Sequence, residues 1–282
     1  MLSCGHRTCE ESVTTPALGS LLRQWRRRRG RSQLALALEA GVSARHVSFV
    51  ESGRANPSRE MVLRLSGSLD LPLRERNALL LVAGYAPVYP ESALEAPDLA
   101  PARRALGLIL DHQEPFPAVV MNRRWELTMA NRGAARFFGL MVDLAALPQP
   151  ANIIRLMLDP AGVRPYVANW DQVAPALVER MRREAAGGVP AGDVEDLIDE
   201  ALRYPGVEHA WRSAAPAGGL EPLLPVHFRT PHGAMRFFST VTTLGTPQDV
   251  TLQELRIECF FPADDSTETA ARKLAAERSL GP

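Results

Sequence analysis

The segment 33–57 constrains the fold more than any other part of the chain, because it has to join two short helices across a tight turn. Gly41 stands where the first helix would end, a position that favours a left-handed backbone. Ser43 can then accept hydrogen bonds from the first free amides of the next helix. Small and β-branched residues are spaced to face inward where the helices would meet: Ala37, Val42, Val47 and Val50. Because all these demands are met together, the segment predicts a helix-turn-helix.

The distribution of charge points to nucleic-acid binding by this helix pair. The whole chain is neutral, but residues 16–87 carry a net charge of +7 and residues 88–282 a net charge of −6. A plain helical hairpin would explain the glycine and the valines, but it leaves unexplained the arginines that precede the motif: Arg23, Arg26–Arg29 and Arg31. A basic first domain beside an acidic second one is typical of a DNA-binding domain with an appended domain of another role.

The second helix of the motif is expected to enter the major groove with its first residues at the base edges. Arg45 can bind guanine in bidentate fashion, and Phe49 either touches a thymine methyl group or packs on a neighbouring helix. Gln33, Arg54 and Asn56 flank the two helices and are placed to bind phosphates. Such contacts fix the position of the protein on the DNA but do not read its base sequence. The residues predicted to contact DNA are Gln33, Ser43, Ala44, Arg45, His46, Ser48, Phe49, Arg54 and Asn56.

Composition divides the chain into five segments. The predicted boundaries are 1–15 for a disordered leader, 16–86 for an all-helical domain, 87–102 for a proline-rich linker, 103–263 for a second domain and 264–282 for a charged, helical tail. The leader holds Cys4, His6 and Cys9, but no neighbouring segment offers a fourth ligand, so no metal site is predicted. An odd number of cysteines also argues against a disulfide framework.

The second domain changes its hydrophobic period along its length. Apolar spacing of three and four predicts helices at 102–112, 132–138, 152–158, 165–185 and 193–204. Two short strands are predicted at 118–121 and 125–130, and a three-stranded antiparallel meander at 223–230, 235–244 and 252–261. Strands, then helices, then strands predict an α+β domain with its helices packed to one side of a sheet.

The second domain lacks the common signatures of catalysis. It has no Gly-x-Ser-x-Gly elbow and no glycine-rich phosphate loop, and its histidines are scattered without metal-ligand spacing. Its many large apolar side chains form either a packed core or the walls of a cavity. Alternation along 235–244 places Phe237 and Ser239 on one face, which suits apolar walls with a few polar anchors. The candidate ligand contacts are Trp125, Phe137, Met157, Trp170, His227 and Phe237.

A family resemblance in the first domain rests on three runs of residues. They are Ser32-Gln33, Gly41-Val42-Ser43 and Glu51–Ser58. With these runs the segment resembles the Cro/repressor-type (XRE) helix-turn-helix family. The resemblance implies a five-helix fold for residues 16–86 and binding to near-palindromic operator DNA as a homodimer.

A second resemblance covers residues 105–262. The residues that carry it are Asn122, Trp125, Asn131–Ala134, Asn152–Pro160, Arg164, Asn169-Trp170, Trp211, Gly233 and Gly245–Glu258. They resemble the MmyB-like ligand-binding domain, a PAS-like fold that follows an XRE domain. The run Leu224–Phe228, which contains His227, departs from the family's usual His-Pro stretch. The resemblance implies a fatty acid or a similar apolar small molecule as ligand, and no other cofactor.

The chain is therefore expected to be multidomain, with an all-α five-helix helix-turn-helix domain followed by an α+β PAS-like domain. We expect a sequence-specific transcription regulator and not an enzyme, with operator DNA, a small apolar ligand and a second copy as partners. A constitutive regulator whose second domain only dimerises, or an enzyme with a DNA-binding tether, are the alternatives. No apolar run of about 18 residues indicates a membrane span and no signal peptide is visible, so a cytoplasmic location is expected.

Overall fold

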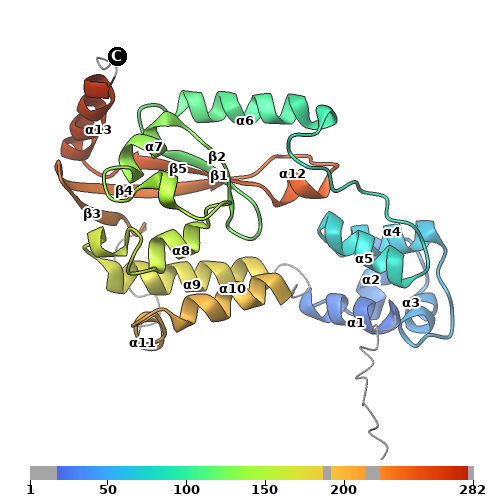
Figure 1. Cartoon of the computed structure of the whole chain (residues 1–282). Coiled ribbons are helices and arrows are strands. Elements are labelled where there is room, and N and C mark those ends of the chain that lie inside the picture. Colours follow the sequence, from blue (N-terminus) through green and yellow to red (C-terminus); the bar gives the residue numbers. More distant parts are fainter. Residues whose placement is uncertain (1–17, 187–191, 214–222, 279–282) are drawn as a thin grey trace, which may run out of the picture. The chain divides into compact units, whose positions relative to one another are not determined.

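The computed structural model describes residues 18–186, 192–213 and 223–278. Two compact units make up the chain, one through Tyr89 and one from Pro90 onward, and each is described by itself (Figure 1). The predicted leader lies outside the described residues. No helix within the described ranges is long and apolar enough to cross a membrane.

The N-terminal unit is a bundle of short helices. They are α1 (Leu18–Arg28), α2 (Gln33–Glu39), α3 (Ala44–Glu51), α4 (Arg59–Ser68) and α5 (Leu73–Val82). A serine precedes each of α2, α3 and α4, and its hydroxyl accepts a hydrogen bond from a backbone amide of the first turn: Ser32, Ser43 and Ser58. Gly41 has a φ of 64° in the turn between α2 and α3, as its position in the motif requires. The predictions of a helix-turn-helix and of a five-helix domain are confirmed.

The core of the N-terminal unit takes one face from each helix. The side chains that are at most 2% exposed include Leu22, Trp25, Leu36, Val47, Leu65 and Leu80. Gly19 lets α1 approach the end of α3, since a Cβ at this position would lie 2.6 Å from the carbonyl oxygens of Val50 and Glu51. The recognition motif is thus held by close backbone packing against α1.

A five-stranded antiparallel sheet is the centre of the C-terminal unit. Its strands are β1 (Ala118–Met121), β2 (Leu127–Ala130), β3 (Val226–Thr230), β4 (Gly233–Thr242) and β5 (Arg256–Pro262). Their order across the sheet is β2-β1-β5-β4-β3, with every neighbouring pair antiparallel. The predicted meander is therefore present, and it joins the first hairpin through the pairing of β1 with β5. The α+β fold class is confirmed.

Two predicted elements differ from the structure because backbone amides find hydrogen-bond partners outside the predicted strand or helix. Residues 252–254, expected in a strand, belong to α12 (Val250–Glu254), whose first turn is capped by the carboxylate of Asp249. The helix expected from 165 divides into the short η3 (Arg164–Tyr166) and α9 (Trp170–Ala186). Between them the amide of Ala168 donates a hydrogen bond to the carbonyl of His227 in β3, which draws the backbone out of the helical path.

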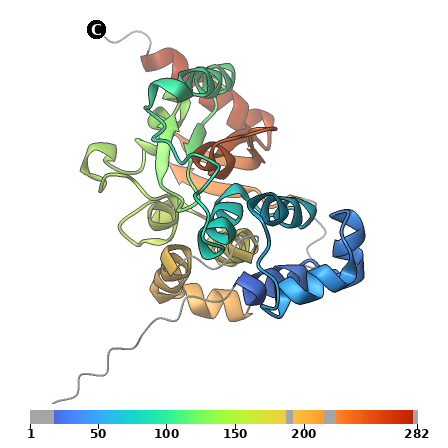
Figure 2. The same cartoon turned by 90° about the vertical axis from the view of Figure 1, so that its right-hand side faces the viewer.

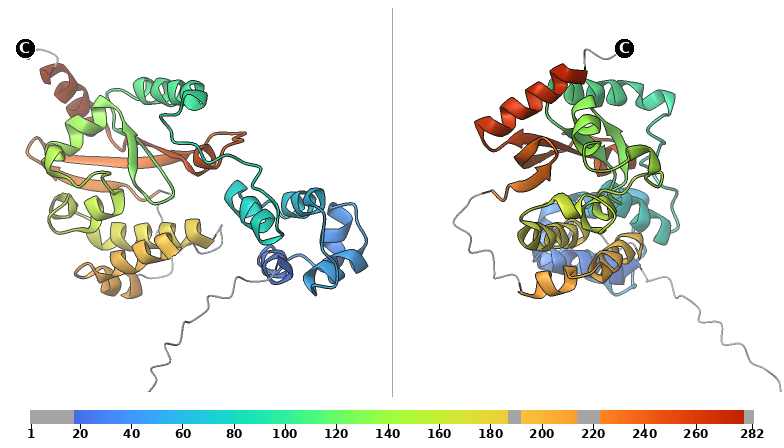
Figure 3. Two further views of the ribbon diagram at one scale, coloured as in Figure 1. Left: turned by 45° about the vertical axis from the view of Figure 1, so that its right-hand side comes forward. Right: turned by 60° about the vertical axis from the view of Figure 1, so that its left-hand side comes forward.

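Helices cover both faces of the sheet, so the expectation that they pack to one side is wrong. On one face α6 (Ala100–His112) buries Leu106 and Leu110 against Ala118 and Val120 of β1. On the opposite face lie α7 (Arg132–Phe138), α8 (Ile153–Leu158), α9, α10 (Gly192–Arg203) and α11 (Val207–Ser213). Figures 1 and 3 show α6 across the sheet from α8, α9 and α10. All four residues of β1 are buried, which is why this strand shows no alternation in its sequence.

The segments predicted as linker and tail are ordered in the described chain. Leu94 and Leu99 each have 7% of their surface exposed, and the amide of Ser92 donates a hydrogen bond to Asp249. The helix η1 (Pro97–Leu99) leads directly into α6. At the other end α13 (Asp265–Arg278) packs against β4 and β5, beside which Figure 2 shows it. Both segments therefore contribute to the packing of the C-terminal unit.

Candidate functional site

The outer face of α3 carries Arg45 and Phe49, two of the residues predicted to contact DNA. Val47 and Val50 are 0% and 2% exposed, so the remaining face of the helix points away from the core. On it the guanidinium carbon of Arg45 lies 5.1 Å from the ring centroid of Phe49. Phe49 therefore packs against Arg45 on the surface of its own helix. The stack holds the arginine at the helix face, where a guanidinium can form two hydrogen bonds to guanine.

The other predicted DNA contacts lie in different environments. Ala44 and Ser48 are partly exposed on α3, and Arg54 and Asn56 are exposed in the loop that follows it. Ser43 caps α3, since its hydroxyl accepts a hydrogen bond from the amide of His46. His46 itself is half-buried, and its Nε2 is enclosed with no hydrogen-bond partner among the described residues. Gln33 donates a hydrogen bond from its side-chain amide to Glu51 over 2.8 Å, so part of its hydrogen-bonding capacity is used within the fold.

Glu51, at the last position of α3, is the polar centre of the N-terminal unit. Its side chain is fully buried and accepts two hydrogen bonds from Arg26, at 2.6 Å from Nε and 3.0 Å from Nη2. Arg23 donates to the backbone carbonyl of Glu51 over 3.0 Å. These contacts, with that of Gln33, tie α1 and α2 to the end of α3. Sequence reasoning missed this role, although an acid that follows Val50 on a helix otherwise surrounded by arginines was a signal for it.

The pairing also changes how the carboxyl group titrates. Burial alone would raise the pKa of Glu51, but hydrogen bonds from Arg26 and Gln33 and the charges of Arg26 and Arg23 together hold its pKa below the ordinary value. A carboxylate with a lowered pKa in the folded state contributes stability above its unfolded pKa and loses it as pH falls through the folded pKa.

We therefore expect the N-terminal unit to lose stability in acid in a way that depends on Glu51. Hydrogen exchange of peptides from α1 and α3, corrected for the intrinsic slowing of amide exchange in acid, should show falling protection in the wild type below pH ~4.3, the ordinary pKa of a glutamate. The Glu51→Gln variant should start from lower stability and show a flatter dependence on pH. The same acid sensitivity in both proteins would show that another group titrates.

Several arginines that precede the motif hold the fold together. Arg29 donates from Nε and Nη2 to the carbonyls of Leu69 and Asp70, over 3.0 and 2.7 Å, and so caps the C-terminus of α4. Arg26 is buried against Glu51. The suggestion that a helical hairpin leaves these arginines unexplained is therefore wrong for Arg26 and Arg29. Three arginines after α3 and on α4 are exposed: Arg54, Arg59 and Arg64.

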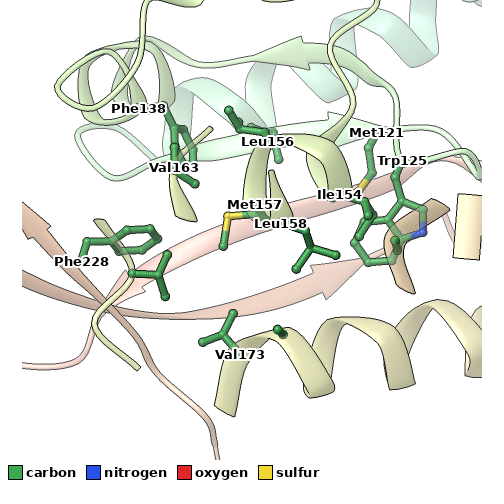
Figure 4. Close-up of a cluster of buried hydrophobic side chains, with 14 of the residues drawn as sticks. Met121, Trp125, Phe138, Ile154, Leu156, Met157, Leu158, Val163, Val173 and Phe228 are labelled. Carbon is green, nitrogen blue, oxygen red and sulfur yellow. The ribbon is translucent and has the colours of Figure 1, made fainter. Parts of the chain in front are cut away.

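A cavity of about 220 Å³ lies in the C-terminal unit between α8, α9 and the sheet. Twelve of its sixteen lining residues are apolar, and they include Val119, Trp125, Phe138, Leu156, Met157 and Val173. Figure 4 shows Met157 beside its sequence neighbour Leu158 and among Val173 and Phe228, which come from other parts of the chain. The polar side chains at the wall are Arg180, Arg183, Ser239 and Glu258. Apolar walls with a small group of polar anchors are typical of small-molecule sites.

Three of the polar side chains at the cavity wall, Arg180, Ser239 and Glu258, form a connected network with Glu184. Arg180 donates from Nη1 to Glu258 and from Nε to Glu184, each over 3.0 Å. Ser239 donates to the other oxygen of Glu258 over 2.6 Å. The guanidinium of Arg180 also lies 4.5 Å from the ring centroid of Trp125. Burial would lower the pKa of Arg180, but the charges of Glu258 and Glu184 outweigh it and raise the pKa, so the guanidinium stays charged.

The predicted ligand contacts divide between the cavity and its surroundings. Trp125 and Met157 line the cavity. Phe137 and Phe237 pack edge to face with ring centroids 5.0 Å apart in the core beside it. Trp170 stacks under the guanidinium of Arg164, which lies 3.9 Å from its ring centroid. His227 lies in β3, and its backbone amide donates a hydrogen bond to Asn169.

Sequence reasoning missed three of the polar residues that line the cavity. Arg180 and Glu258 appeared as ordinary charged residues of a helix and a strand, because the hydrogen bond between them joins positions 78 residues apart. No pattern in the sequence distinguished Arg183 from the other arginines of its helix. Ser239 was recognised only as a polar residue on the face that it shares with Phe237. Among the described residues, no group of three or more His, Cys, Asp or Glu side chains is arranged to hold a metal ion.

Comparison with known proteins finds a matching family model within each unit. Residues 102–274 match the model of the MmyB-like transcription regulator ligand binding domain, and residues 22–76 match that of the helix-turn-helix. A search of curated proteins finds no match. Among solved structures, that of an RNA-binding Light-Oxygen-Voltage Receptor is similar at 11% identity and a TM-score of 0.26, over 98% of this chain and 69% of the other.

Proposed function

The chain belongs to the family that carries the MmyB-like transcription regulator ligand binding domain, and from this premise we propose that its C-terminal unit senses an apolar small molecule built on a fatty-acid-like chain. The two matched families make the chain a DNA-binding transcription regulator with a ligand-binding domain. The observation that carries the proposal is the cavity of about 220 Å³ with apolar walls and a polar network at one part of its wall. An engineered apolar cavity of ~150 Å³ holds benzene, so this volume suffices for a short acyl chain.

In this proposal the ligand controls the affinity for DNA. A ligand shifts a conformational equilibrium only if it binds the two states with different affinity. The protein acts as a homodimer on operator DNA, and the ligand changes the population of the arrangement that fits both half-sites. The chain works in the cytoplasm and carries no catalytic activity of its own.

Extraction of the purified full chain tests the sensor function. Organic extracts analysed by mass spectrometry should contain a small apolar molecule, and adding that molecule to the stripped protein should raise its melting temperature. A chain that carries no such molecule, and whose melting temperature no apolar compound shifts, would favour a constitutive regulator whose C-terminal domain only dimerises.

Sequence-specific binding to DNA has its own test. Arg45→Ala should remove ~1–3 kcal/mol of discrimination at one base pair, because the guanidinium reads a base edge. Arg54→Ala should weaken binding to all sequences similarly, because this exposed arginine contacts phosphate. Selection of sites from a random duplex library, followed by fluorescence anisotropy on selected and scrambled duplexes, measures both effects. An equal loss of specificity in both variants would contradict these assigned roles.

A further inference from the structure

The stack of Arg45 on Phe49 fixes how two side chains lie on the outer face of α3. The residues are four positions apart on the helix, so their side chains project from the same side of it. The guanidinium carbon of Arg45 lies over the ring of Phe49, 5.1 Å from the ring centroid. Arg45 is exposed and Phe49 is only partly buried, so a partner that binds this face of α3 can contact both side chains at once.

The plane of the guanidinium determines where the ring lies in the major groove of DNA. A guanidinium that donates two hydrogen bonds to O6 and N7 of guanine lies close to the plane of that base pair. Phe49 stacks on the guanidinium of Arg45, so its ring then lies above or below the base-pair plane. Successive bases are ~3.4 Å apart along the helix axis, and the ring centroid is 5.1 Å from the guanidinium carbon. The ring therefore reaches the level of a neighbouring base pair.

At that level an apolar ring favours one kind of base. Of the four bases of DNA, only thymine presents an apolar substituent in the major groove, the methyl group on C5, whereas the other bases present hydrogen-bond donors and acceptors there. A phenyl ring satisfies none of these polar groups and removes water from them, which is unfavourable. 5-Methylcytosine carries the same methyl group as thymine. The ring of Phe49 is therefore complementary to a 5-methylpyrimidine.

We propose that Arg45 and Phe49 together read a step of two neighbouring base pairs, one with a guanine bound by Arg45 and the other with a 5-methylpyrimidine whose methyl group packs on Phe49. This inference rests on the base-reading role proposed for Arg45 and names the base step that α3 recognises. Phe49 contacts the methyl group and also holds the guanidinium in the orientation that guanine requires. The two bases are therefore recognised jointly and not one by one.

Removal of single methyl groups from the DNA tests the contact with the wild-type chain. In a duplex selected from a random library, each thymine is replaced in turn by deoxyuridine, which lacks only the methyl group. Replacement of a thymine beside a guanine should weaken binding about fourfold, the effect of exposing about one methyl group, and thymines elsewhere in the duplex are the matched control. Cytosine and 5-methylcytosine at the same position should differ by the same factor. Fluorescence anisotropy measures each affinity.

The outcomes separate this inference from the DNA-reading function itself. If the selected duplex has no thymine beside a guanine, or if deoxyuridine at such thymines binds as tightly as thymine, the proposed step is overturned while specific binding to DNA stands. If the chain selects no sequence from the library, the base-reading role of Arg45 and the proposed step both fail.

The variant Phe49→Ala assigns the methyl contact to the ring. The ratio of thymine to deoxyuridine affinity should fall from about fourfold to about one, because no apolar ring remains beside the methyl group. Arg54→Ala is the matched control, since Arg54 is exposed in the loop after α3. It should weaken binding to both duplexes and leave their ratio unchanged. A ratio that stays about fourfold in Phe49→Ala, or that falls equally in the control, would overturn the contact with Phe49.

A change in the guanine tests whether the stack orients Arg45. 7-Deazaguanine lacks the N7 acceptor, so it should weaken binding of the wild type about tenfold and have little effect on Arg45→Ala. In Phe49→Ala this loss should be smaller than in the wild type, because the guanidinium is no longer held by the ring. Circular dichroism and the melting temperature of the free variants show that they are folded. An equal loss in the wild type and in folded Phe49→Ala would overturn the joint recognition of the two bases.

Discussion

Replacing Glu51 by alanine should destabilise the N-terminal unit by about 3–5 kcal/mol, because it leaves the buried guanidinium of Arg26 without its partner. The loss is large compared with the stability of a small helical domain, so binding to DNA should also fall. Hydrogen exchange with mass spectrometry on the full chain measures the effect by region. Amides of α1, α2 and α3 should exchange faster, and those of the sheet in the C-terminal unit should not.

Glu39→Ala is the matched control for this change. Glu39 pairs with Arg31 at 3.2 Å, but both side chains are more than 40% exposed. Exposed pairs of this kind contribute about 0–1 kcal/mol, so exchange should hardly change. Equal effects of the two substitutions would mean that burial of the Glu51 carboxylate does not stabilise the unit.

Replacing Phe237 by alanine should destabilise the C-terminal unit by about 3–5 kcal/mol, the usual cost of deleting a buried aromatic ring. Phe237 is 0% exposed and packs edge to face against Phe137 at 5.0 Å, which in turn packs against Phe228 at 5.0 Å. The three rings form the core beside the cavity. Exchange of amides in β1, β4 and β5 should accelerate, and hydrogen exchange with mass spectrometry on the full chain measures this effect.

The neighbouring residue provides the control on the opposite face of the strand. Phe238 is only partly buried and stacks on Phe261 with ring centroids 5.6 Å apart. Phe238→Ala should cost about 1–2 kcal/mol, because less apolar area leaves water in the folded state. If Phe238→Ala were as destabilising as Phe237→Ala, the face of β4 that carries Phe237 would not be the main core of this unit.

Features with a local cause were predictable from the sequence. Gly41 and Ser43 mark the end of one helix and the start of the next through backbone conformation and capping, which depend on a few adjacent residues. Val47 and Val50 follow from helical spacing, and the strand alternation placed Phe237 and Ser239 on one face. The family resemblances led to the same two-unit architecture.

Features that depend on distant partners were not predictable in this way. The expectation of helices on one side of the sheet failed because the sequence of β1 shows only that the strand is buried, not what covers each face. Helix α12 took the place of a strand start because Asp249 caps it and also binds the amide of Ser92, far earlier in the chain. The arginine run before the motif resembled a DNA-binding surface, and only packing showed that Arg26 and Arg29 are used inside the fold.

Patterns along the chain were enough to predict a helix-turn-helix with Arg45 on its outer face, and an α+β domain with enough large apolar residues to enclose a site. Which side chains meet became visible in the folded chain: Glu51 with Arg26, 25 residues away, and Glu258 with Arg180, 78 residues away. Caps, turns and periodicity act between near neighbours along the chain, whereas hydrogen bonds inside a core depend on strand register and helix packing. The cavity with its polar network is a property of that packing.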